Sequence, residues 1–372
     1  MASPSLDQIL IASAALISHL QDTLTNTSSQ EQPASSKPIN PLALSSTAAA
    51  LIKAQTTKLT LLALNKPFTP SSIIQILNTI SASPLPALIT AVQQCDPVRF
   101  SRFARYELQS RVSRLLQVYK TLLEQIPTST KAQESSISIS RAGNSRNGNA
   151  IDQKAALMGT GLVWEVCDEI IAFSEQGLGT MASKKMTSYR GLFNDGLEEI
   201  NDWLEEGRDS SHLEDSMDAM NVDDTSSDST SIGSFSPHPT AETIPVAEWT
   251  LNILHHIALL YPPLLKRRIL IFPECNGKTP LEAVPMQAIP KLDLLLDACK
   301  SWSEQIDLIA EALYENQTES AMERVDTLVG STREPIEVAK AAWDGSEDKF
   351  SAWIDQWTKK MSEVKTKARP PT

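Results

Sequence analysis

The stretch MASKKMTSYRGLFNDGLEEINDWLEE, residues 181–206, carries the clearest structural signal in the sequence. Its large apolar side chains recur every three or four residues, at Tyr189, Phe193, Leu197, Ile200, Trp203 and Leu204. At about 100° per residue, this spacing places them on one side of an α-helix. The reverse side collects the acidic residues Asp195, Glu198, Asp202, Glu205 and Glu206. The stretch therefore predicts an amphipathic helix with an apolar inner face and an acidic outer face.

The same spacing recurs through most of the chain and predicts an all-α protein. Clear apolar stripes occur in residues 42–65, 151–175, 292–313 and 350–364. Only residues 268–272 resemble a β-strand, and they are short and isolated. Helices joined by short connections, without alternating β patterns, predict helix bundles.

Helix ends are marked by proline and glycine. Thr69-Pro70 and Asp96-Pro97 each combine an N-cap residue with proline at the first helical position. The second of these signals predicts one long helix up to Pro127. Gly177 and Gly179 predict a turn between two helices. Pro335 predicts a kink or break in the helical segment 325–343.

The negative charge of the chain is concentrated in one region. The sequence has 45 acidic and 33 basic residues, a net charge of −12. Residues 195–228 contain 13 acidic residues and one basic residue, so this window alone has a net charge of −12. Without a basic surplus, the composition argues against a nucleic-acid binder.

The end of this acidic region divides the chain into three parts. Residues 208–240 hold seven acidic residues, twelve Ser or Thr and few apolar side chains, so they predict a disordered acidic linker. The expected domains are an N-terminal bundle over 1–207, with flexible loops at 28–41 and 128–150, and a C-terminal bundle over 241–372.

The linker also suggests regulation by phosphorylation. Ser211 and Thr225 each have an acidic residue three positions later, and Ser236 precedes proline. Phosphorylation would add about −1.5 to −2 charges per site. These three residues are candidate modification sites.

No motif in the sequence predicts catalysis, a metal site or a cofactor. Gly277-Lys278-Thr279 resembles the end of a phosphate-binding loop but lacks the glycine required five positions earlier. No histidine lies three residues after a glutamate, as di-metal bundles require, and the four cysteines are far apart. No stretch approaches the roughly 18 uninterrupted apolar residues of a membrane span. We expect a protein that is not an enzyme and that binds neither nucleic acid nor membrane.

The segment Thr160-Gly-Leu-Val-Trp-Glu-Val-Cys-Asp-Glu-Ile170, followed by residues 189–206, resembles the cyclin-D-binding protein family, also called GCIP-like. Trp164, Cys167 and Asp168 hold the positions that match the family pattern, and the resemblance is best over residues 150–207. It implies two helix bundles with the up-and-down packing of vinculin or talin. It also implies a non-catalytic protein, in nucleus and cytoplasm, that binds cyclin D or helix-loop-helix regulators and regulates cell-cycle progression or transcription.

Three classes of function remain open at this point, the third being an enzyme with an unrecognised carboxylate site. The first is an interaction module that binds regulatory protein partners through the acidic outer face of residues 181–206. The second is a vinculin-like scaffold or cytoskeletal adaptor, in which a bundle helix is exchanged for a partner helix. Binding to actin filaments would distinguish the first two.

Overall fold

The computed structural model describes residues 5–26, 39–64, 69–126, 147–217, 238–280, 283, 285–367 and 369–370. Within these ranges, the side chains of 147–153 and 209–217 are not described. The chain forms two compact units, Met1–Met181 with Glu274–Ile289, and Ala182–Pro273 with Pro290–Thr372. The described residues are predominantly helical and include no β-strand, which confirms the all-α prediction.

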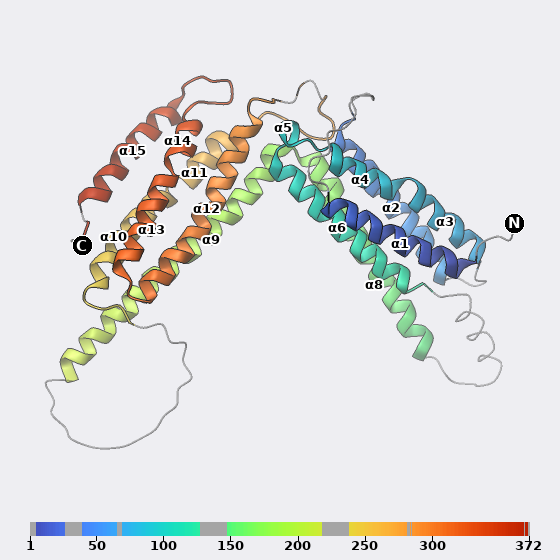
Figure 1. Ribbon diagram of the computed structural model, residues 1–372, viewed down its shortest axis with the longest axis horizontal. Coiled ribbons are helices and arrows are strands. Elements are labelled where there is room, and N and C mark those ends of the chain that lie inside the picture. Colours follow the sequence, from blue (N-terminus) through green and yellow to red (C-terminus); the bar gives the residue numbers. More distant parts are fainter. Residues whose placement is uncertain are drawn as a thin grey trace, which may run out of the picture. The chain divides into compact units, whose positions relative to one another are not determined.

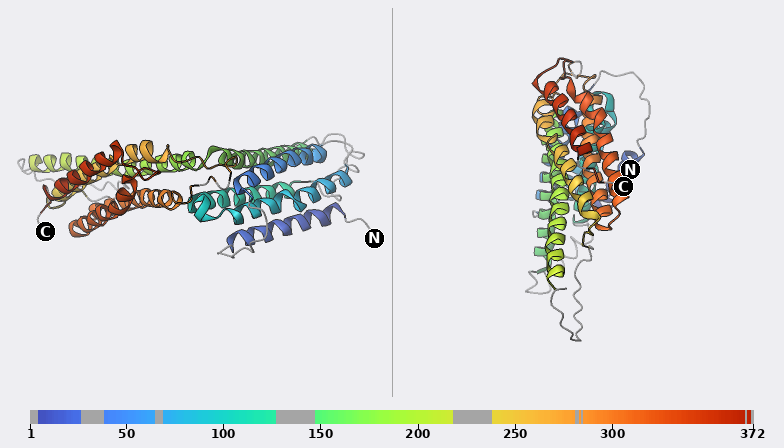
Figure 2. Two further views of the ribbon diagram at one scale, coloured as in Figure 1. Left: turned by 90° about the horizontal axis from the view of Figure 1, so that it is seen from above. Right: turned by 90° about the vertical axis from the view of Figure 1, so that its left-hand side faces the viewer.

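The first unit is built from seven described helices, six of them longer than ten residues (Figure 1). They are α1 (Leu6–Thr25), α2 (Pro41–Leu64), α3 (Pro70–Ala82), α4 (Pro84–Gln94), α5 (Pro97–Phe100), α6 (Arg102–Glu124) and α8 (Asn147–Gln176). α8 packs against both α2 and α6, while α1 packs against α3 and α6 (Figures 1 and 2). This is the up-and-down bundle that the sequence predicts.

Hydroxyl pairs fix the register of α2 against α8. The Oγ atoms of Ser45 and Ser174 lie 2.9 Å apart, and the Oγ1 atoms of Thr60 and Thr160 lie 2.6 Å apart. The residue numbers rise along α2 as they fall along α8, so the two helices are antiparallel. All four residues are buried. Because a buried hydroxyl without a partner is costly, a shift of one helix along the other is disfavoured.

The second unit contains most of α9 (Leu178–Met217) and the helices that follow it. These are α10 (Thr243–Ala258), α11 (Tyr261–Leu264), the π-helical turn η1 (Leu265–Ile269), α12 (Ile289–Tyr314), α13 (Thr318–Ser331), α14 (Arg333–Lys340) and α15 (Lys349–Lys367). α15 packs against α10 and α14, and α13 packs against α10. The break between α13 and α14 confirms the interruption predicted near Pro335.

Aromatic side chains form much of the core of the second unit. Tyr261 lies between Phe193 and Trp302, with ring centroids 5.6 and 5.8 Å away. Trp203 contacts Tyr314 at 5.2 Å, which joins α9 to α12. All of these residues except Tyr314 are buried. Large aromatic surfaces of this kind contribute strongly to bundle stability.

The structure corrects three predictions. The boundary between units lies at Met181, near the start of α9, rather than at residue 207, because α9 carries the chain from one unit into the other. The strand-like residues 268–272 instead begin in the last two residues of the π-helical turn η1 and continue into a turn. The single long helix expected after Asp96 is divided into α5 and α6 by Ser101, a buried residue with φ of 73°.

The predicted loops and linker are only partly described. Residues 28–38, 128–146 and 218–237 lie outside the described residues. Pro41, the last residue of the predicted loop 28–41, is the first residue of α2. Residues 147–150 of the predicted loop 128–150 belong to α8, which starts at Asn147. α9 continues to Met217, so a disordered linker starting at 208 is wrong for its first ten residues.

By length and apolar composition alone, one described stretch, Pro70–Gln94, could cross a membrane. It consists of two helices, α3 and α4, separated at Ser83. Both pack against α2, and Ile73, Leu77 and Leu88 are fully buried in the first unit. A core helix pair accounts for its apolar character.

Candidate functional site

The acidic face of α9 forms the candidate partner surface. All five residues that the sequence assigned to it are exposed, and Glu199 is exposed beside them. We call the set the acidic ridge: Asp195, Glu198, Glu199, Asp202, Glu205 and Glu206. Their exposure confirms the predicted orientation of the helix, while their role in binding stays a prediction.

The negative field of the ridge extends onto α12 within the same unit. Partial burial raises the pKa of Asp307, and the nearby carboxylates of Glu199 and Glu304 raise it further. Carboxylates that disfavour one another's ionised forms produce a concentrated negative potential. This surface is suited to a partner with a basic face.

The apolar face of α9 holds the ridge in place. Phe193, Ile200 and Leu204 are buried, as the sequence predicts. Gly196 allows close approach to α12, since a Cβ atom there would lie 3.0 Å from Cγ2 of Ile306. α9 is therefore fixed against α12 along the side opposite the acidic residues.

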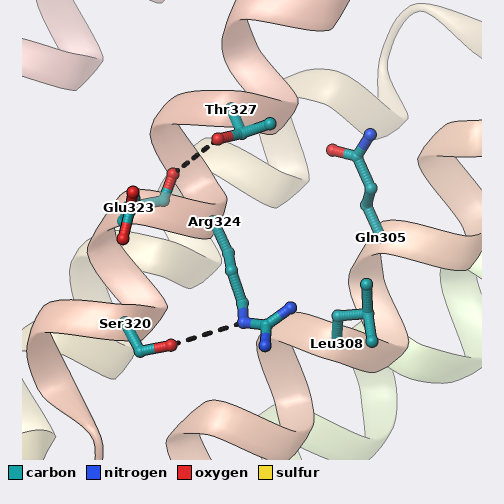
Figure 3. Close-up of a pocket in the computed structure, with 6 residues that line it drawn as sticks. All are labelled: Gln305, Leu308, Ser320, Glu323, Arg324 and Thr327. Atoms are coloured by element: carbon teal, nitrogen blue, oxygen red, sulfur yellow. Dashed lines mark hydrogen bonds between the residues drawn. The ribbon is translucent and has the colours of Figure 1, made fainter.

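A groove of about 460 Å³ lies between α12 and α13 of the second unit (Figure 3). It is lined by Gln305, Leu308, Ser320, Glu323, Arg324 and Thr327. Figure 3 shows the Arg324 side chain extending toward Leu308, with its Nε donating to Ser320 Oγ at 3.4 Å. The lining combines one cation, one carboxylate and neutral side chains.

The exposed side of α8 differs from the prediction. Val163, Val166, Ile170 and Phe173 are buried, but Leu162 and Trp164 are 47% and 38% exposed. A tryptophan in an apolar helical segment is expected in the core, but Trp164 lies partly at the surface. Leu157 and Met158 on the same helix are also exposed, at 54% and 62%. α8 thus presents large apolar side chains to solvent near its N-terminal half.

Charged residues on the following turns of α8 pair with its neighbours. Lys53 of α2 donates to Asp168 at 2.6 Å, and Arg114 of α6 donates to Glu169 at 2.8 Å. Arg114 also lies 3.4 Å from Glu165. These ion pairs join α8 to α2 and α6 within the first unit.

The Gly277-Lys278-Thr279 segment has a structural role in the first unit. The Gly277 N–H donates to the carbonyl of Ser174 at 2.8 Å, near the end of α8. A Cβ atom at Gly277 would lie 3.2 Å from that same carbonyl oxygen, so glycine permits the close contact. Asn40 Nδ2 donates to the carbonyls of Asn276 and Thr279. The segment closes one end of the α2–α8 pair.

The adjacent histidines of α10 and the cysteines are accounted for by packing. His256 stacks on Trp357 with ring centroids 5.0 Å apart, while His255 is exposed. The four cysteines are buried, and burial raises the pKa of Cys95, Cys167 and Cys275 to about 12. Within the described residues, no group of three His, Cys, Asp or Glu could hold a metal ion.

The candidate modification sites are not described. Thr225 and Ser236 lie outside the described residues. Ser211 belongs to the helical backbone of α9, but its side chain is not described. Phosphorylation at these three residues stays a prediction.

Residues 46–206 run from within α2 to within α9 and include α8 and the acidic ridge. They match the family described as Grap2 and cyclin-D-interacting, N-terminal. This match confirms the resemblance to the cyclin-D-binding protein family for that segment of the chain. No curated protein matches the chain.

The sequence did not predict the surface position of Trp164 or the Arg324 groove. Trp164 is followed by the buried residues Val166 and Cys167, and apolar content alone places all three in the core. One available signal was the neighbouring carboxylates Glu165 and Asp168, which share the outward side of the helix with Trp164. No local signal marked the groove, because its walls come from two helices.

Proposed function

We propose that this chain is a non-catalytic protein-interaction module, and that the acidic ridge of α9 binds a regulatory protein through a basic surface. The single observation that carries the proposal is the position of the ridge. It lies within the segment that matches the cyclin-D-interacting family, and all six carboxylates are exposed. The family description points to cyclin D as the first partner to test. Regulation of cell-cycle progression or transcription, in nucleus and cytoplasm, follows as part of the proposal.

Electrostatic attraction of this kind acts mainly on association rate and specificity. Exposed ion pairs contribute about 0.2–1 kcal/mol each. Neutralising three ridge residues should therefore weaken binding by between about threefold and a hundredfold. It should also reduce the dependence of affinity on salt concentration, because fewer charges attract the partner.

The test compares two triple variants of the full chain in binding to purified cyclin D by calorimetry at several salt concentrations. The first variant is Glu198→Gln, Asp202→Asn and Glu205→Gln, in the ridge. The control is Glu319→Gln, Glu334→Gln and Glu347→Gln, three exposed acidic residues elsewhere in the second unit. The proposal predicts weaker, less salt-sensitive binding for the first variant alone. Equal effects of both variants would contradict it.

Binding to actin filaments tests the scaffold alternative. Co-sedimentation of the full chain with filaments, unaffected by the ridge substitutions, would support a vinculin-like adaptor over the proposed module. Binding to cyclin D that depends on the ridge, without co-sedimentation, supports the module.

A further inference from the structure

The exposed apolar residues of α8 form a compact surface centred on one glycine. Leu157, Met158 and Trp164 lie within four residues of Gly161 and are 54%, 62% and 38% exposed. We call Gly161 together with Leu157, Met158 and Trp164 the α8 apolar surface. Clustered apolar side chains on a protein surface mark sites of association.

Packing against the part of the chain that the structure describes does not require glycine at position 161. A Cβ atom at this position would meet nothing within 4 Å, whereas one at Gly159 would lie 2.6 Å from Gln125 Oε1. Gly159 is therefore required by internal packing and Gly161 is not. A glycine inside a helix destabilises it relative to alanine. The absence of a side chain in the middle of an apolar surface allows another backbone to approach closely.

The charges on either side of Gly161 are opposite and equally spaced. Lys154 lies seven residues before it and Asp168 lies seven residues after it. Seven residues are nearly two helical turns, so both lie about 10 Å from Gly161 along the axis and close to the same face. Both are exposed, and Lys154 forms no ion pair with any residue that the structure describes. Asp168 contacts Lys53 but remains 58% exposed.

This pattern is complementary to itself when reversed. If two α8 helices cross antiparallel at Gly161, residues before the glycine face residues after it in the other copy. Leu157 then lies near the partner's Trp164, and Lys154 lies near the partner's Asp168. A two-fold contact makes each of these pairings twice, as self-complementary interfaces do.

We propose that the chain forms a homodimer through its α8 apolar surface, with the two α8 helices antiparallel and crossing at Gly161. The occupant of the surface is thus a second copy of this chain. The proposal is independent of the acidic ridge and of cyclin D, because it uses a different helix in a different unit. The proposal gives a function to Trp164 and Asp168, two of the residues that match the family pattern. Both are exposed, although the packing of the bundle does not require this.

The first test measures the oligomeric state of the full chain by sedimentation. The expected result is a dimer whose dissociation constant rises at least about tenfold in Gly161→Gln. The same substitution should raise thermal stability, because it replaces a glycine that destabilises the helix. Gly191→Gln is the matched control, because a Cβ there also meets nothing within 4 Å. It should raise stability without changing the dimer. A monomer at all concentrations, or a dimer unaffected by Gly161→Gln, overturns the proposal.

The second test examines the antiparallel arrangement. Lys154→Asp should weaken the dimer, and adding Asp168→Lys should restore it, since the charges are exchanged between copies. Gly161→Cys should be joined efficiently to its own copy by a short bis-maleimide, because position 161 lies on the two-fold axis. Gly191→Cys should not. Failure of charge exchange to restore the dimer, or equal linkage at both positions, overturns the arrangement.

A third outcome concerns another occupant. If the chain sediments as a monomer and Gly161→Gln instead abolishes binding to a different protein, the surface serves a heterologous helix and the homodimer is wrong. Ridge variants that lose cyclin D binding should still dimerise. Each proposal can therefore be refuted without affecting the other.

Discussion

Asp348→Asn is expected to destabilise the second unit by about 2–3 kcal/mol. Asp348 accepts two hydrogen bonds from the Arg268 guanidinium, at 2.8 and 3.1 Å. Arg268 is only 1% exposed and also donates to the carbonyls of Ala339 and Lys340, at 2.6 and 2.9 Å. The guanidinium lies 4.7 Å from the centre of the Phe350 ring. The substitution leaves this buried cation without its counterion.

The magnitude follows from burial. Breaking a buried ion pair costs about 3–5 kcal/mol, because the remaining charge stays desolvated. The Asp348 side chain is 36% exposed, so water compensates for part of the loss and lowers the expected cost to about 2–3 kcal/mol. For a unit of this size, the corresponding decrease in Tm is roughly 4–12 °C.

The assay is urea and thermal unfolding followed by tryptophan fluorescence. Of the seven tryptophans in the chain, only Trp164 lies outside the second unit, so the signal reports mainly on that unit. Asp344→Asn is the control, because Asp344 lies in the same loop but bonds only to Ser346. A loss below about 0.5 kcal/mol for Asp348→Asn would refute the reasoning, which rests on the cost of an uncompensated buried charge.

The pH dependence gives an independent check. Hydrogen bonds from Arg268 hold the pKa of Asp348 far below its usual range, despite the opposing effect of partial burial. Because the folded pKa is depressed, the stabilisation is present above the unfolded pKa of about 3.9 and is lost as pH falls below it. The unmodified protein should therefore lose stability more steeply than Asp348→Asn below about pH 4. Parallel curves would contradict this assignment.

Three further predictions concern packing. Gly191→Ala should stabilise α9 by up to about 1 kcal/mol in urea unfolding, whereas Gly196→Ala should give less or none, because its Cβ would lie 3.0 Å from Ile306. Ser45→Ala should cost about 0.5–1.5 kcal/mol, the value of one hydrogen bond, because the buried Ser174 hydroxyl still donates to the Ile170 carbonyl, and the Ser45→Ala, Ser174→Ala double variant should cost less than the two single losses combined. The four buried cysteines should react with a thiol reagent at pH 8 only at the rate of unfolding, since burial keeps them protonated; fast labelling of the native protein would disprove this.

Local patterns predicted the helices and the orientation of α9 well. The spacing from Tyr189 to Leu204 identified its buried face, and the intervening carboxylates identified the ridge. Gly177, with φ of 79°, ends α8 where predicted, and Pro97 starts α5 after the Asp96 cap. These features depend on residues within a few turns of one another, so a single stretch of sequence contains the information.

Contacts between distant segments could not be predicted in the same way. Arg268 ends the basic run Lys266-Arg267-Arg268, which locally predicts exposure, yet it is buried because carbonyls more than seventy residues later accept its hydrogen bonds. Trp164 is exposed because, among the described residues, the strongest contacts of α8 are with α2 and α6, and Trp164 lies away from both. The boundary at Met181 falls near the start of a continuous helix, where composition does not change.

The sequence by itself determined that this protein is helical, where most helices begin and end, and that one helix has an acidic outer face. Periodicity, capping and proline chemistry act over a few residues, so they do not depend on the rest of the fold. Only the tertiary structure decided which apolar residues remain at the surface, which hydroxyls pair and where the two units divide. Burial depends on which helices pack together, and that choice is made by contacts between segments far apart in the chain.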